Sequence, residues 1–115
     1  MPYLLIKTNH QISEHEQSAL LADALKIVAT NLAKPEKYVM VGYEPIPALI
    51  FDGNPDPAVF LDLRSIGIPE SARKTIAGAL AKCMVEHLGI SADRIYLVMT
   101  DVPAKHWGQG EATFG

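Results

Sequence analysis

Short apolar runs alternate with longer amphipathic stretches along this chain of 115 residues. Four mostly apolar runs, each followed by turn-forming or polar residues, predict β-strands at residues 3–8, 39–44, 59–63 and 95–100. The segment between the second and third runs is rich in Pro, Asp, Gly and Asn, which is typical of a loop. The pattern therefore predicts the order strand, helix, strand, repeated once.

One amphipathic helix is predicted between the two strands of each half. The first has apolar residues at helical spacing, namely Leu21, Leu25, Val28 and Leu32. Ser13 and Glu16 form a capping box at its start, and we expect it to end near Lys34 because Pro35 disfavours helical geometry in the residue before it. The second helix has its apolar face at Ile76, Leu80, Cys83, Met84, Val85 and Leu88. Gly89 is a natural residue just past its end.

The two halves of the chain align with each other at one constant spacing. Residues 3–5 align with 59–61, and Leu32, Val39 and Val41 align with Leu88, Ile95 and Leu97. This regularity predicts two βαβ units of about 55 residues, each with parallel strands joined by a right-handed crossover. The predicted fold class is α+β: one domain over residues 1–115, with a four-stranded sheet and both helices on one face.

The last predicted strand indicates self-association. Residues 95–99 are almost uninterrupted apolar residues, the pattern of a strand buried on both faces. The chain offers no third helix to cover the second face of the sheet. We therefore expect an oligomer whose interior is made of sheets.

Composition and charge narrow the range of partners. A formal net charge of −3 without a basic stripe argues against nucleic acid, and no apolar run approaches the roughly 20 residues that span a membrane. The single cysteine, Cys83, cannot form an intramolecular disulfide, and the four histidines lack ligand spacing, so we expect no metal site. The first residues lack the features of a signal peptide, which predicts a cytoplasmic protein, although leaderless secretion leaves no mark in a sequence.

Several segments together carry a family resemblance. They are the opening Met-Pro-Tyr-Leu-Leu-Ile-Lys-Thr-Asn, Ala-Lys-Pro-Glu-Lys-Tyr-Val at 33–39, Arg-Ser-Ile-Gly at 64–67, Ile-Ser-Ala-Asp-Arg-Ile-Tyr at 90–96 and the tail Ala-Thr-Phe-Gly. In order and spacing the whole chain resembles the macrophage migration inhibitory factor family of the tautomerase superfamily. The resemblance implies a homotrimer with active sites between subunits, and cofactor-free tautomerisation of phenylpyruvate-like keto acids or dopachrome-like model substrates. Some members are secreted signalling proteins, so it also implies a protein receptor as a second kind of partner.

Pro2 is the candidate general base. Methionine aminopeptidases remove Met1 before a small residue, which would leave a prolyl secondary amine. An α-amino group ordinarily titrates near ~8, and an apolar wall lowers its pKa by disfavouring the charged form. A base poised near the working pH suits proton abstraction beside a carbonyl. Proline is common at position two, so the assignment depends on the resemblance rather than on the residue alone.

The resemblance places three further residues around the substrate. Lys34 would pair with the substrate carboxylate, while the alternative is a cation that stabilises the end of a helix by about 0.3–1 kcal/mol. Ile66 would donate its backbone N–H to the developing enolate oxygen, while the neighbouring Ser65 is an alternative as a simple cap of the turn. Tyr96 would enter the pocket from the neighbouring subunit, while the alternative is a structural tyrosine with a bonded hydroxyl.

Trp107 and Phe114 are candidates for an aromatic wall. Two positions depart from the family pattern, which usually has asparagine where Val98 stands and a tryptophan after the glycine equivalent to Gly108, not before it. These departures motivate an alternative function: a cytokine-like or intracellular interaction protein with weak or vestigial tautomerase activity.

A third hypothesis keeps Pro2 but changes the reaction to decarboxylation or hydration of an unsaturated acid. Relatives with that chemistry generally add a pocket arginine. Arg64 and Arg73 are the nearby candidates in the sequence, and neither matches such a position clearly.

Overall fold

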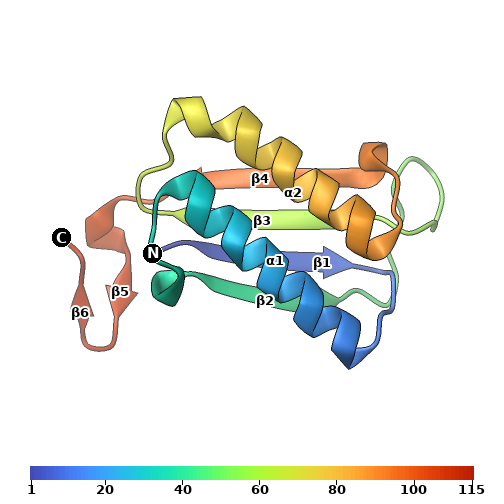
Figure 1. Ribbon diagram of the computed structural model, residues 1–115, viewed down its shortest axis with the longest axis horizontal. Helices are drawn as coiled ribbons and strands as arrows, with labels where there is room; N and C mark the ends of the chain where they lie inside the picture. The colour runs from blue at the N-terminus through green and yellow to red at the C-terminus, as the bar shows by residue number, and fades with distance from the viewer.

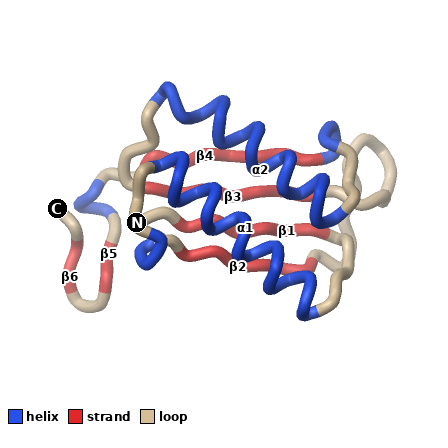
Figure 2. Tube along the Cα trace, in the orientation of Figure 1, coloured by secondary structure: helices blue, strands red, loops and turns tan.

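The computed structural model describes residues 1–115 and consists of a four-stranded sheet with two helices on one face (Figure 1). The strands are β1 (Tyr3–Thr8), β2 (Met40–Pro45), β3 (Val59–Ser65) and β4 (Ile95–Asp101), in the spatial order β2-β1-β3-β4. β1 is parallel to β2 and β3 to β4, whereas β1 and β3 are antiparallel. The helices α1 (Glu14–Leu32) and α2 (Arg73–Leu88) lie side by side (Figure 2). The predicted fold class is confirmed.

Alternation along the strands decides which side chains the helices cover. Leu4 and Ile6 of β1 and Leu61 and Leu63 of β3 are completely buried and form the centre of the core. Cys83 of α2 belongs to the same core, and burial raises the pKa of its thiol to about 11. This is the inert, apolar environment expected of a small core residue.

Hydrogen bonds fix both ends of helix α1, and the sequence predicts those at its start. The Ser13 hydroxyl accepts the Glu16 N–H at 3.1 Å, and the Glu16 carboxylate accepts the Ser13 N–H at 3.0 Å, so the predicted capping box is confirmed. The last helical residue is Leu32, slightly earlier than expected, because Ala33 adopts a left-handed conformation with φ 52°. The N–H of Lys34 then donates back to the carbonyl of Ala29 at 2.9 Å.

The internal repeat extends to these helix ends. Gly89 follows α2 in the same left-handed conformation, with φ 66°. A 3-10 turn then precedes each following strand, at Glu36–Tyr38 in the first half and Ala92–Arg94 in the second. The two βαβ units therefore match in their turns as well as in their apolar positions.

Replacing Ala33 with glycine is expected to stabilise the fold, and the repeat supplies a matched control. The left-handed conformation costs an L-residue roughly 1–2 kcal/mol, partly offset by the greater freedom of glycine in the unfolded chain. We expect Ala33→Gly to raise the free energy of unfolding by about 1 kcal/mol and Gly89→Ala to lower it by a similar amount. Urea unfolding measures both changes. A destabilised Ala33→Gly variant would contradict this account of the helix end.

The sheet face opposite the helices is uncovered within one protomer. Burial alternates along β4, and Tyr96 and Val98 on the open face are 58% and 48% exposed. No helix lies over this side, so one face of β4 is open in the protomer, as the lack of a third helix predicted. Met40, in the other edge strand, is 66% exposed. Apolar side chains gathered on an open sheet face are typical of a protein interface.

After β4 the chain leaves the sheet and forms a small hairpin that the sequence did not predict. A 3-10 turn at Ala104–His106 leads into β5 (Gly108–Gln109), which pairs antiparallel with β6 (Ala112–Thr113). The hairpin lies beyond the end of the sheet at which the N-terminus also lies (Figure 1). Both ends of the chain therefore lie at the same end of the sheet.

Candidate active site

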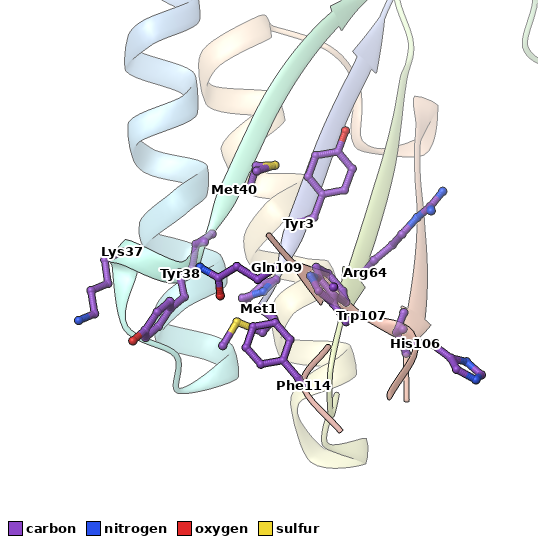
Figure 3. A pocket seen from close by; sticks show the side chains of 14 residues that line it. Met1, Tyr3, Lys37, Tyr38, Met40, Arg64, His106, Trp107, Gln109 and Phe114 are labelled. Carbon is purple, nitrogen blue, oxygen red and sulfur yellow. The ribbon is translucent and has the colours of Figure 1, made fainter. Parts of the chain in front are cut away.

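A cavity of about 740 Å³ opens where β1 begins and β3 ends (Figure 3). Its lining includes the aromatic residues Tyr3, Tyr38, Trp107 and Phe114 and the basic residues Lys37, Arg64 and His106. No aspartate or glutamate lines it. In a chain of net charge −3, a basic cavity without carboxylates favours an anionic small molecule.

Pro2 lies in the wall of this cavity, directly before β1. Its side chain is completely buried, and its carbonyl accepts the N–H of Met40 at 3.0 Å. This bond continues the pairing of β1 with β2 by one residue and fixes the start of the strand. Met1 lines the same cavity, so removal of Met1 places the terminal amine on the proline at this wall.

The environment of the chain start disfavours a charged amine. Burial, and after it the positive charge of Lys34, lower the pKa of the Met1 α-amino group below its ordinary value. Both causes act against protonation, because burial removes solvation and a nearby cation repels the charged form. A terminal amine on Pro2 would meet the same two influences one residue closer to the core.

Lys34 and Lys37 occupy different positions around the cavity. Lys34 is half-buried just past the end of α1, outside the cavity lining, with its charge acting on the terminal amine. Lys37 is exposed and lines the cavity, and its ammonium lies 5.0 Å from the centre of the Tyr38 ring. The two lysines provide a natural comparison for the predicted role of Lys34.

Ile66 follows the last residue of β3, beside the cavity but not among its lining residues. Its N–H has no hydrogen-bond partner in the protomer, whereas the next two N–H groups, of Gly67 and Ile68, donate to Asp101. The alternative that Ser65 caps this turn is wrong, since its hydroxyl is buried without a partner. The carboxylate of Asp101 is the cap instead.

The C-terminal segment supplies one wall of the cavity. Trp107 and Phe114 both line it, and the N–H of Phe114 donates to the Trp107 carbonyl at 3.1 Å, next to the β5–β6 hairpin. Figure 3 shows the Phe114 ring near Met1. His106 lines the cavity as well and is exposed. The two aromatic residues predicted from the tail are thus brought to Pro2.

Tyr96 does not meet Pro2 within one protomer. It pairs with Phe60 at the start of β3, whereas Pro2 lies near the residues at the end of that strand. Its ring centre is 4.6 Å from that of Phe51, and both line a second, smaller cavity of about 170 Å³. Tyr96 is therefore available to another copy of the chain, as its predicted role requires.

Arg64, one of the two arginines considered for a pocket role, lines the cavity. In the β1–β3 register it lies opposite Tyr3, next to Pro2. Its guanidinium donates to the Asp62 carboxylate at 3.3 and 3.1 Å, and this hydrogen bonding and charge raise the pKa of Arg64 further. Arg73, the other arginine considered, is not in the lining. Recognising Arg64 required the register of β1 against β3, which apolar periodicity alone does not give.

Two general features of the chain bear on other kinds of site. No group of three or more His, Cys, Asp and Glu side chains is arranged to hold a metal ion. Neither helix combines the length and apolar character needed to cross a membrane.

Comparison with known proteins gives a consistent assignment. The family model of macrophage migration inhibitory factor (MIF) matches residues 1–115. A macrophage migration inhibitory factor homolog of Brugia malayi is 34% identical over 117 residues, with 100% of both chains covered. Among solved structures, macrophage migration inhibitory factor of Toxoplasma gondii is 39% identical with a TM-score of 0.93, covering 97% of this chain and 99% of that one. A homologue from Prochlorococcus marinus is 32% identical with a TM-score of 0.92, covering 98% and 99%. The chain belongs to the macrophage migration inhibitory factor family.

Proposed function

We propose that the protein is a keto–enol tautomerase of phenylpyruvate-like keto acids, with the Pro2 amine as general base. Membership of the family supports a tautomerase or cytokine-like role. The observation that carries the enzymatic proposal is the buried position of Pro2 in the wall of a basic, partly aromatic cavity without carboxylates. Pro2 is then the buried base of the site, and an anionic keto acid is the substrate that the charges favour.

The reaction moves one proton and requires no external electron acceptor. The neutral Pro2 amine takes a proton from the carbon next to the substrate carbonyl, and the C–H electron pair forms the C=C bond. The carbonyl π electrons move to oxygen, which becomes an enolate. The enolate oxygen then takes up a proton while the Pro2 ammonium gives one up, directly or through water, which yields the enol and restores the neutral amine. The reverse sequence returns the keto acid. A base whose pKa lies near the working pH serves both directions.

The other predicted residues bind the acid and its developing charge. Lys34 pairs with the carboxylate, and the unpaired N–H of Ile66 donates to the enolate oxygen. A fixed backbone donor needs no reorganisation when charge appears, which is why such donors stabilise transition states strongly. Trp107 and Phe114 provide apolar surface for the aromatic ring of the substrate.

We propose that the active form is a homotrimer, with Tyr96 of one copy completing the cavity of the next. The open sheet face and the distance of Tyr96 from Pro2 along the sheet support this arrangement. Native mass spectrometry should then find a species of three times 12.5 kDa. A monomer with full activity would contradict it.

Insertion of a lysine between Met1 and Pro2 tests the proposal, because aminopeptidases do not remove methionine before a large residue. Intact mass should show that the natural protein has lost Met1 and that the insertion variant has not. We expect the processed protein to turn over phenylpyruvate and the variant to be at least ~100-fold slower, the scale of general base catalysis. Equal turnover would overturn Pro2 as the base.

The interaction-protein alternative predicts another result for the same samples. It predicts negligible turnover from a trimer that carries a free Pro2 amine. The two departures from the family pattern motivate it: the exposed Val98, where the family usually has asparagine, and Trp107, which precedes Gly108. The decarboxylase or hydratase alternative would use Arg64, which lines the cavity with its guanidinium 3.1 Å from the Asp62 carboxylate. A basic residue at this place serves either reaction, so Arg64 does not favour that alternative over tautomerisation.

A further inference from the structure

We propose that Asp101 is a positioning residue for the reaction. It holds the turn after β3 in a conformation in which the Ile66 N–H stays free to donate to the substrate. The inference rests on the proposed function for the identity of the acceptor, a substrate oxygen. It assigns a role to a carboxylate that neither lines the cavity nor takes part in the proton transfer.

Of three consecutive backbone N–H groups at this turn, two are hydrogen-bonded and one is not. The N–H of Gly67 donates to Oδ1 of Asp101 at 2.9 Å, and the N–H of Ile68 donates to Oδ2 at 3.0 Å. The N–H of Ile66, immediately before them, has no partner. One carboxylate therefore satisfies two donors and leaves the third for a ligand.

The turn is held on both sides of Ile66. Before it, Ser65 pairs in register with Asp101, and its carbonyl accepts the N–H of Val102 at 2.8 Å. After it, Gly67 has φ +77°, a conformation that glycine adopts without strain. Asp101 thus ties this turn to the end of β4, and Val102, the next residue, lines the cavity.

The negative charge of Asp101 stabilises its hydrogen bonds to the turn. The N–H groups of Ile68 and then Gly67 lower the pKa of this carboxyl below its ordinary value, so it is ionised at neutral pH. An ionised carboxylate offers only acceptors, and here each oxygen faces an N–H. Replacing it with asparagine turns one acceptor into an NH₂ group that opposes a backbone donor, which loosens the turn with little change of volume.

The test compares Asp101→Asn with Asp93→Asn in the full-length processed protein. Asp93 lies before β4, at the other end of that strand, and its exposed carboxylate accepts the Ser91 hydroxyl at 2.6 Å. We expect Asp101→Asn to lower kcat for phenylpyruvate about tenfold while KM changes less than about threefold. Asp93→Asn should leave both unchanged. Circular dichroism and native mass confirm that the compared proteins are folded and equally assembled.

Amide NMR separates a positioning role from a merely structural one. In the natural protein, phenylpyruvate should shift the Ile66 amide resonance and slow its hydrogen exchange. In Asp101→Asn this response should be lost or much reduced, and Asp101→Glu, which keeps both acceptors, should restore part of it. An unchanged kcat, or an Ile66 response that persists in full in Asp101→Asn, would overturn the inference.

Failure of the proposed function gives a different pattern. If Pro2→Gly retains full turnover, the proline base is wrong, whatever Asp101 does. If Pro2→Gly is inactive and Asp101→Asn is fully active, the base stands and the role of Asp101 falls. If the natural protein shows no turnover, the Ile66 amide response to phenylpyruvate tests the role of Asp101. Loss of the response in Asp101→Asn supports the positioning role, and its persistence refutes it.

Discussion

Pro2→Gly is expected to lower kcat/KM for phenylpyruvate by roughly 10²- to 10⁴-fold, the range of general base catalysis. Glycine keeps a terminal amine but loses the ring that is buried in the cavity wall. The amine of glycine is free to rotate and to reach solvent, so its pKa should return toward the ~8 of an ordinary α-amino group. Base strength, position and desolvation are therefore lost together. Steady-state kinetics over a range of pH measures the effect.

The control for this change is a residue in the same wall with no acid–base role. The backbone N–H of Met40 donates to the Pro2 carbonyl, so a change of the Met40 side chain leaves this bond in place. Met40→Leu should therefore retain activity within a few-fold. A Pro2→Gly variant that is as active as Met40→Leu would remove the proline amine from the mechanism.

Lys34→Ala is expected to raise KM for phenylpyruvate roughly 10- to 150-fold, the equivalent of one hydrogen bond to a charged group. It should also change the pH dependence. Burial, and after it the charge of Lys34, lower the pKa of the Met1 α-amino group. We expect the same two influences on the Pro2 amine, so removal of Lys34 should let the pKa of that amine rise. Because the neutral amine is the active form, the acid limb of the rate profile should move to higher pH.

Lys37→Ala is the matched comparison for this prediction. Lys37 is exposed, lines the cavity and lies over the Tyr38 ring. We expect only a few-fold rise in KM and a much smaller shift of the acid limb, since solvent screens an exposed charge. If Lys37→Ala has the larger effect on KM, the carboxylate is bound by Lys37 and the role predicted for Lys34 is wrong.

The fold was largely predictable because its signals are local. Apolar periodicity located the four strands and both helices, and the constant spacing between the halves gave the parallel pairs. The hairpin at β5–β6 was missed because its two-residue strands contain glycine and polar residues, and no local pattern distinguishes them from a loop. The open face of β4 was predictable too, because the chain has only two helices and both lie on the other face of the sheet. The self-association inferred from this face stays a prediction.

The site was predictable only in part, because it depends on register. Pro2, Trp107 and Phe114 line one cavity, as predicted. Arg64 was considered for the pocket but matched no position clearly, and Asp101 was not considered, since only the pairing of β1 with β3 and of β3 with β4 brings them to the start of the chain. Their types, a surface arginine and a strand-end aspartate, give no signal of their own. Tyr96 needs a second copy of the chain to meet Pro2.

Titration of the Pro2 amine is the most direct test of the central claim. The ¹⁵N resonance of Pro2, followed by NMR in the processed protein, reports its pKa, and kcat/KM for phenylpyruvate is measured over the same pH range. We predict a pKa below the ~8 of an ordinary α-amino group, coincident with the acid limb of the rate profile. An amine that titrates at or above ~8, or an acid limb that does not follow it, would contradict the account.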